Sequence, residues 1–349
     1  MTQSYGPKVI TMAAKLPNSP LEENSNNLKG SDMMFRKKNF FNLLLIVSFL
    51  TAVFNPNTSL DLILGKSDGA ATTSQVVKEE TLLGKKNVNQ SLGTWLWNTS
   101  EIYTSKDKVV SFVKKERITE LYLQIDKGMD FSYYKDFISE LNLLGVSVYA
   151  LDGAPNYINE EGKASLESFF VWVEKYQNAV SSGQKFKGIH LDVEPYILSQ
   201  WNSEQTSTIG KYKNFVKSAN EKAKALSMPV VFDIPFWFDE MPSYGEGENL
   251  ADFVIKNSDG VNIMAYREQG SVIVEIVKNE LTYGAKSGKR VIVGVETNKS
   301  SEGETVTFYE EGRSYMNKQL EVVKRKLGSK PAFSGFAIHD YDGWKSLKP

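Results

Sequence analysis

The sequence has no cysteine, only two histidines and almost no net charge. Without cysteine the chain contains no disulfide, no thiolate metal site and no cysteine nucleophile. Two histidines in 349 residues leave little room for a multi-histidine metal site, so we expect neither a metal nor another cofactor. A formal charge of −1 gives no electrostatic reason to expect nucleic acid as a partner. The chemistry of this protein must therefore come mainly from carboxylates, tyrosines and the two imidazoles.

The composition is that of a folded protein with a large core. Apolar residues make up 41% of the chain and aromatic residues 12%, which excludes a wholly disordered chain because such side chains avoid water. Domains contain roughly 150 residues, so the length allows two ordinary domains or one large domain with an appendage. The sequence pattern favours the second arrangement.

The first ninety residues differ in character from the rest. Residues 1–32 are polar without a clear period and are predicted to be disordered. Residues 33–55 place a basic stretch before a 15-residue apolar run, the pattern of a secretory signal or a short membrane anchor. Residues 56–90 are rich in Asn, Ser, Thr, Gly and Lys, which is typical of a linker. We therefore expect an extracellular or cell-surface protein that meets the membrane only through this N-terminal segment.

Residues 91–349 alternate eight times between short apolar runs and amphipathic stretches. Such alternation predicts parallel strands joined by helical crossovers. Eight units in roughly 260 residues match a (β/α)8 barrel, whereas the alternative, an open doubly wound sheet, lacks its Gly-x-Gly-x-x-Gly turn here. The predicted strands are 92–97, 120–125, 146–151, 188–194, 230–234, 260–265, 291–295 and 335–339.

The fourth predicted strand carries the most informative residues. Side chains alternate along a strand, so Ile189 and Leu191 fall on a face that suits packing against helices. His190, Asp192 and Glu194 fall on the other face, which enters the barrel. A purely structural core would carry Val or Leu there, because burying ionisable groups costs free energy unless they are paired or hydrated. A functional site is therefore predicted, with a buried salt-bridge layer as the alternative.

Several other strands place polar side chains at their carboxyl ends, where barrel enzymes build their active sites. These candidate site residues are Asp233, Asn262, Tyr266, Glu296, His339 and Asp340. Both histidines of the chain thus belong to the predicted site, although a single His at such a position is more often structural. Small residues beneath them, Gly294, Gly335 and Ala337, are expected to leave room for a ligand.

The segment from Phe186 to Pro195, FKGIHLDVEP, resembles the strand-four signature of family 18 glycoside hydrolases, the chitinase-like barrels. That signature reads Asp-Gly-x-Asp-x-Asp-x-Glu. The segment NIMAY, which ends at Tyr266, is similar to the family's Met-x-Tyr on strand six. The resemblance implies a barrel that hydrolyses a glycan containing N-acetylhexosamine, such as chitin or peptidoglycan.

The resemblance also implies roles for three residues. Glu194 takes the place of the general acid, Asp192 that of the aspartate that orients the N-acetyl group, and Tyr266 that of a tyrosine that holds it. The chemistry agrees, because glycosidic cleavage needs a carboxylic acid to protonate the leaving oxygen. Carboxylates two residues apart on a strand lie roughly 7 Å from each other, and their repulsion favours keeping one protonated. His190, deeper on the same face, is expected to hydrogen-bond Asp192.

The sequence departs from the family pattern at three places. The two earlier acidic positions of the signature are Lys187 and His190, and strand eight lacks the family's Trp. Aromatic residues near the barrel mouth are expected to stack on sugar faces, although loop packing is the other role open to each. These aromatic residues are Trp97, Tyr157, Trp237, Phe238 and Trp344, with Trp97 and Trp237 as the candidates for substrate binding.

Three other functions are compatible with the sequence. Clan A glycoside hydrolases place one Glu after strand four and another after strand seven, here Glu194 and Glu296. A carboxyl separation of about 5–5.5 Å would favour that clan's double displacement. A barrel that binds glycan without cleaving it is the second, motivated by the two missing acidic positions. A metal-dependent deacetylase is the third, although His190, His339 and Asp192 would supply only a minimal metal site. In each case the partner is a glycan and the protein is expected to be a monomer.

Overall fold

The computed structural model describes residues 90–349. The N-terminal segments predicted at 1–32, 33–55 and 56–90 lie outside the described residues, except for Gln90. Between residues 90 and 349, every helix is too short or too polar to cross a bilayer.

Eight parallel strands close into a barrel in sequence order. They are β1 (Ser91–Leu96), β2 (Glu120–Gln124), β3 (Ser147–Asp152), β4 (Gly188–Leu191), β5 (Val230–Pro235), β6 (Gly260–Met264), β7 (Arg290–Glu296) and β8 (Phe333–His339). β1 pairs with both β2 and β8, which confirms the predicted (β/α)8 barrel for the described part of the chain.

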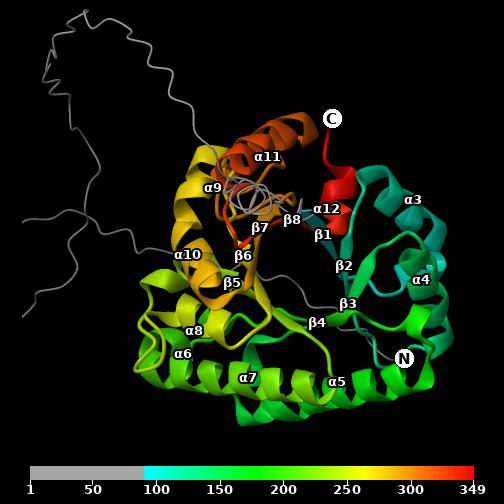
Figure 1. The fold of residues 1–349 in the computed structure, drawn as a ribbon, viewed down its shortest axis with the longest axis horizontal. Coiled ribbons are helices and arrows are strands. Elements are labelled where there is room, and N and C mark those ends of the chain that lie inside the picture. Colours follow the sequence, from blue (N-terminus) through cyan, green and yellow to red (C-terminus); the bar gives the residue numbers. More distant parts are fainter. Residues whose placement is uncertain (1–89) are drawn as a thin grey trace, which may run out of the picture. The chain divides into compact units, whose positions relative to one another are not determined.

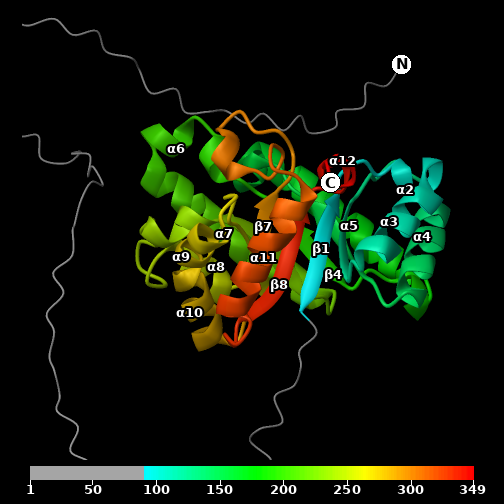
Figure 2. The ribbon, with the colours of Figure 1, turned by 90° about the horizontal axis from the view of Figure 1, so that it is seen from above.

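Helices follow the strands and surround the barrel (Figure 1). The α-helices are α2 (Glu101–Thr104), α3 (Lys106–Glu116), α4 (Phe131–Leu143), α5 (Glu160–Ala179), α6 (Gln200–Ser203), α7 (Gln205–Ala225), α8 (Leu250–Lys256), α9 (Gly270–Ile276), α10 (Lys278–Ser287), α11 (Arg313–Leu327) and α12 (Tyr341–Ser346). Short 3-10 helices are η1 (Pro155–Ile158), η2 (Ser182–Gln184), η3 (Pro195–Ile197), η4 (Phe236–Glu240) and η5 (Glu304–Val306). In Figure 2, β1 and β8 run side by side between α3 and α4 on one side and α9 and α10 on the other.

Local sequence explains where several helices begin and end. α4 begins after Asp130, whose side chain accepts a 2.7 Å hydrogen bond from the Ser132 amide, an N-cap that satisfies a free helical N–H. α10 ends at Ser287, and the following Gly288 has φ 65°, the left-handed conformation that glycine adopts without steric cost. This turn leads the chain into β7.

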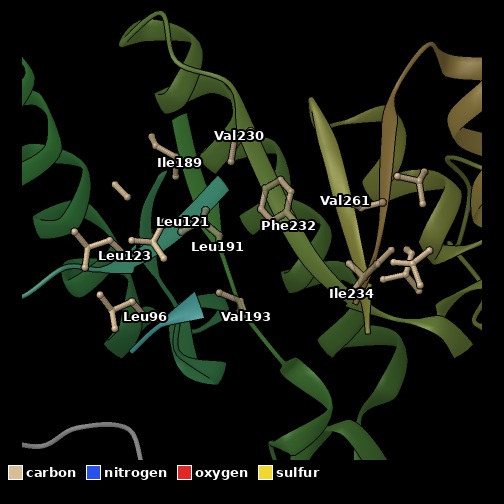
Figure 3. Close-up of a cluster of buried hydrophobic side chains, with 14 of the residues drawn as sticks. Leu96, Leu121, Leu123, Ile189, Leu191, Val193, Val230, Phe232, Ile234 and Val261 are labelled. Carbon is tan, nitrogen blue, oxygen red and sulfur yellow. The ribbon is translucent and has the colours of Figure 1, made fainter. Parts of the chain in front are cut away.

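The outer faces of the strands pack against the helices. Leu121 and Leu123 of β2 join Ile189 and Leu191 of β4 in one buried cluster, which Figure 3 shows in close-up. This cluster contains the residues that the sequence pattern assigns to the helix-facing side of strand four. The alternation predicted for β4 is therefore confirmed.

The inner faces form a separate and aromatic cluster. Trp95, Tyr122 and Tyr149 fill the barrel interior, together with smaller apolar side chains. Gly93 makes room for this packing, because a Cβ there would lie 2.5 Å from the Tyr122 hydroxyl oxygen. The expectation that Gly335 leaves room for a ligand is corrected: its φ is 124°, and a Cβ would lie 2.0 Å from the Ser91 carbonyl oxygen. Its small size serves strand packing.

Candidate active site

The two carboxylates of the motif follow β4 at the carboxyl end of the barrel. β4 ends at Leu191, shorter than the predicted strand, and the Asp192 amide makes one more bond, 3.1 Å long, to the Asp152 carbonyl. Pro195 begins η3 and has no N–H to continue the ladder. The chain therefore turns at Glu194, and both acidic side chains lie at the mouth rather than deep in the barrel.

Asp192 and Glu194 form an electrostatically coupled acid pair. Burial raises the pKa of Asp192 well above its usual range, and the neighbouring charge of Glu194 raises it further. Burial also raises the pKa of Glu194, against the effect of one hydrogen bond from Tyr196. Asp192 Oδ1 is buried without a hydrogen-bond partner among the described residues. The pair therefore tends to hold a proton at pH values where an exposed carboxyl group is ionised.

Tyr196 holds Glu194 in place, a contact that the sequence pattern did not reveal. Its hydroxyl donates a hydrogen bond to Glu194 Oε1. Its ring packs edge-on against Trp237, with ring centroids 5.1 Å apart, and also contacts Trp201. Trp237, predicted as a sugar-stacking residue, thus supports the tyrosine that positions Glu194. No periodicity marks Tyr196, since it lies in the turn after Pro195.

His190 and Asp233 pair inside the barrel, from neighbouring strands β4 and β5. His190 Nε2 lies 2.7 Å from Asp233 Oδ2, and the Trp95 indole N–H donates to the same oxygen at 3.0 Å. The His190 ring also stacks on Tyr122, with centroids 4.0 Å apart. The predicted bond between His190 and Asp192 is wrong, because Nδ1 of His190 has no partner within residues 90–349 and Nε2 contacts Asp233.

Asn262 and Tyr266 approach the site from β6 and the loop after it. Asn262 pairs in register with Asp233, and its fully buried amide group has no hydrogen-bond partner among the described residues. Burial raises the pKa of Tyr266 well above its usual range, and the carboxylates of Glu296, Asp233, Asp192 and Glu194 add to the shift. Tyr266 is therefore a neutral hydroxyl group close to all four.

Glu296 and His339 form a second pair on β7 and β8, where they are partners in register. His339 Nδ1 lies 2.9 Å from Glu296 Oε2. Glu296 Oε1 accepts hydrogen bonds from the Thr297 amide at 2.8 Å, the Asn298 amide at 2.7 Å and the Asn298 side chain at 3.1 Å. Burial raises the pKa of Glu296, but His339 and these hydrogen bonds outweigh burial and lower it overall.

Glu296 and Trp97 favour different protonation states of His339. Burial lowers its pKa, but the charge and hydrogen bond of Glu296 raise the pKa of His339 to about 10. The Trp97 indole N–H, which can only donate, lies 3.1 Å from His339 Nε2 and requires that nitrogen to accept. A ring with its single proton on Nδ1 satisfies both contacts. A second proton, which Glu296 favours, would set the Nε2–H of His339 against the Trp97 N–H.

Other predicted residues have structural contacts. Asp340 caps α12, since its Oδ1 accepts hydrogen bonds from the Gly343 amide and the Asn298 side chain. Phe238 and Trp344 are buried in the outer core, which corrects their expected place at the mouth. Tyr157 is also buried and donates a hydrogen bond to Asp152. Trp97 contacts His339, and both Trp237 and Phe238 pack against Tyr196, which supports Glu194.

The described residues bring the predicted site together around one end of the barrel. Asp192 and Glu194 interact electrostatically with Asp233 and His339, which come from β5 and β8. Within residues 90–349, no three His, Asp or Glu side chains converge in an arrangement that could hold a metal ion. The arrangement provides a protonated carboxyl group, a neighbouring carboxylate and a neutral tyrosine.

No protein-family model and no curated protein matches the sequence. The structure is similar to a chitinase of Chromobacterium violaceum, with 10% identity over 73% of this chain and 97% of that one, and a TM-score of 0.46. It is also similar to the PgaB (BpsB) glycoside hydrolase domain of Bordetella bronchiseptica, with 12% identity over 73% and 94% and a TM-score of 0.45. A GH18 chitinase of Cycas revoluta has 14% identity over 72% and 95% and a TM-score of 0.43. At these identities the likeness concerns the fold alone, and the closed (β/α)8 barrel of this chain is shown by its own strand pairing.

Proposed function

We propose that this protein is a glycoside hydrolase that cleaves a glycan containing N-acetylhexosamine, with Glu194 as the general acid. The observation that carries this proposal is the half-buried Asp192–Glu194 pair at the carboxyl end of β4, in which desolvation raises the pKa of both groups. A raised pKa is what a carboxylic acid needs to stay protonated near neutral pH and to donate to a leaving oxygen.

The contacts of the pair suggest how the roles divide. Tyr196 occupies Oε1 of Glu194, so the proton to be delivered is carried by Oε2. In substrate-assisted hydrolysis, Glu194 protonates the glycosidic oxygen, the bond from C1 to that oxygen breaks as the acetamido oxygen of the sugar bonds to C1, and the rest of the glycan leaves as an alcohol. Asp192, whose Oδ1 has no partner among the described residues, would accept a hydrogen bond from the acetamido N–H. The ionised Glu194 then takes a proton from a water molecule whose oxygen attacks C1, which breaks the bond from C1 to the acetamido oxygen and restores the acid.

The proposal is tested by product analysis on a panel of soluble chitooligosaccharides, peptidoglycan fragments and cello-oligosaccharides. We expect cleavage of the glycans that carry N-acetyl groups and no cleavage of cello-oligosaccharides, because only an acetamido group supplies the internal nucleophile. Proton NMR of the first product should show retention of the anomeric configuration. Binding without any product across the panel would instead support a glycan-binding barrel, to which the departures at Lys187 and His190 point.

A retaining mechanism with Glu296 as nucleophile predicts that azide restores activity to the Glu296→Ala variant, whereas the substrate-assisted mechanism does not. Four hydrogen bonds occupy the two oxygens of Glu296, so it suits a structural or orienting role better than attack on carbon. We therefore expect that azide does not restore activity to Glu296→Ala and that no glycosyl azide forms. Azide rescue with a glycosyl azide product, detected by mass spectrometry, would establish double displacement.

We also propose that the protein acts outside the cell or at its surface, where such polymers occur. The support is the basic and then apolar pattern of residues 33–55, which lie outside the described residues.

A further inference from the structure

Asp233 is the most enclosed carboxylate of the site, and its surroundings are unusual for a group that touches neither solvent nor a cation from Lys or Arg. Its side chain is 1% exposed. Oδ2 accepts a hydrogen bond from the Trp95 indole at 3.0 Å and lies 2.7 Å from His190 Nε2. Oδ1 is buried without a partner among residues 90–349. Side chains from β1 and β4 thus converge on one carboxylate of β5.

These contacts favour a negative charge on Asp233. Trp95 can only donate to Oδ2, and a proton on Oδ2 would make His190 Nε2 the acceptor. The ring N–H of His190 would then lie on Nδ1, which is buried without a partner among the described residues. A proton on Oδ1 would have no acceptor among the described residues and would leave a buried O–H unpaired. The His190 ring stacks on Tyr122, which holds the imidazole in place next to Oδ2 of Asp233.

The charge of Asp233 faces the acid pair. Burial is the main cause of the raised pKa values of Asp192 and Glu194, and the Asp233 charge raises both further. The titratable groups around Asp233 are His190 on β4, Asp192 and Glu194 after β4, Tyr122 on β2, Tyr212 on α7 and Tyr266 after β6. The tyrosines stay neutral, because burial raises the pKa of each above its usual value. Asp233 is therefore a fixed charge next to two carboxyl groups, Asp192 and Glu194, that can gain and lose a proton.

We propose that Asp233 is a positioning residue: His190 and Trp95 fix it as a carboxylate beside the acid pair, and its charge keeps one proton on the Asp192–Glu194 pair. The catalytic importance of Asp233 rests on the proposed function, whereas the effect of its charge on the protonation of Asp192 and Glu194 does not. His190 occupies a position of strand four that is acidic in the signature. Because His190 contacts Asp233, a negative charge still lies beside the acid pair, but it is carried by β5 instead of β4.

The test compares the pH dependence of kcat/KM for the wild type and Asp233→Asn on a chitooligosaccharide. Asn has the same shape and can still accept from Trp95, so the variant removes mainly the charge. We expect the alkaline limb to move to lower pH by about one unit, because removal of one nearby negative charge makes the acid lose its proton more readily. An alkaline limb that stays in place, in a variant with the circular dichroism and Tm of the wild type, would overturn the proposal.

Asp152→Asn is the matched control. Asp152 is also a buried carboxylate at the end of a strand, but its side chain bonds Gln124 and Tyr157. The main charges that act on the pKa of Asp192 and Glu194 are others, Asp233 among them. We expect its alkaline limb to coincide with that of the wild type. A shift equal to that of Asp233→Asn would show that any buried rim carboxylate acts in this way, which would overturn a specific role of Asp233.

A second readout separates this proposal from the proposed function. Carboxyl 13C NMR titration follows Asp192 without any substrate, and we expect its midpoint to fall in Asp233→Asn. If the midpoint falls but no glycan is cleaved, the positioning role stands and the proposed function fails. If the midpoint is unchanged, the positioning role fails whatever the activity. Should the variant not fold, the carboxyl 13C chemical shift of Asp233 in the wild type decides, since a neutral Asp233 at the pH of maximal activity contradicts the proposal.

Discussion

Glu194→Gln is expected to lose about 10²–10⁴-fold in kcat on N-acetylated oligosaccharides, the range typical for removal of a general acid. Gln keeps the shape of Glu and can still contact the Tyr196 hydroxyl, but it has no proton to give to the leaving oxygen. KM should change little, because binding of the glycan does not depend on that proton. Steady-state kinetics on a chitooligosaccharide, with the Tm as a check of folding, measures the effect.

Glu302→Gln is the matched control for this variant. Glu302 is exposed and lies close enough to act on the pKa of Glu194, but its charge is screened by solvent. We expect its kcat to stay within about twofold of the wild type. Full activity in Glu194→Gln would refute the assignment of the acid, and an equal loss in both variants would point to a general effect of charge at the mouth.

The same assignment predicts the direction of the pH dependence. Burial raises the pKa of Glu194, so the acid stays protonated to a higher pH than an exposed Glu, whose pKa is about 4.3. Activity should be retained through that range and be lost as the pH rises through the raised pKa. In Glu194→Gln the residual rate should show no such alkaline limb.

Glu280→Met is expected to stabilise the protein by about 3 kcal/mol at pH 7, a large change for one substitution. Glu280 lies on α10 with none of its surface exposed, and neither carboxyl oxygen has a hydrogen-bond partner among the described residues. Burial raises the pKa of Glu280 from 4.5 to about 8, with a smaller contribution from Asp239. Met fills a similar volume without a polar group that needs a partner.

The sign follows from proton linkage. In the unfolded chain Glu280 loses its proton near pH 4.5, whereas in the folded protein it keeps the proton until about pH 8. Between these values the folded state binds more protons, so the free energy of unfolding falls as the pH rises. The full cost approaches about 5 kcal/mol above pH 8, because each pKa unit corresponds to about 1.4 kcal/mol. Glu280→Met should therefore gain little at pH 4 and most at pH 9.

Urea unfolding of the wild type and the variant at pH values from 4 to 9 measures this prediction. Glu280→Gln removes the titration but keeps an unpaired polar group, so we expect the flatter pH dependence of Met with less stabilisation. Glu275→Gln, at an exposed ion pair with Lys278, should change the free energy of unfolding by less than about 0.5 kcal/mol. If the free energy of unfolding had the same pH dependence in the wild type and in Glu280→Met, the raised pKa of the buried Glu280 would be contradicted.

The strand pattern of this protein is readable from its sequence because it depends on short-range periodicity. Apolar runs at regular intervals predict eight strands, and alternation within strand four separates Ile189 and Leu191 from His190 and Asp192, as the structure confirms. The place of the site follows as well, since all strands of a parallel barrel end at the same rim. Ends of strands are less readable, and β4 stops at Leu191 because Pro195 and the turn after it interrupt the ladder.

The partners of the site residues were decided by tertiary structure. Closure of the barrel and the register between strands bring Asp233 to His190 and Glu296 to His339, and no spacing within one strand contains that information. The same holds for Trp95, which reaches across the interior to Asp233, and for Tyr196, which turns back to Glu194. The sequence by itself determined the barrel, its active end and the residue types available there. Only the packing of side chains from different strands decided which charges are paired, because electrostatic contacts depend on distance in space rather than along the chain.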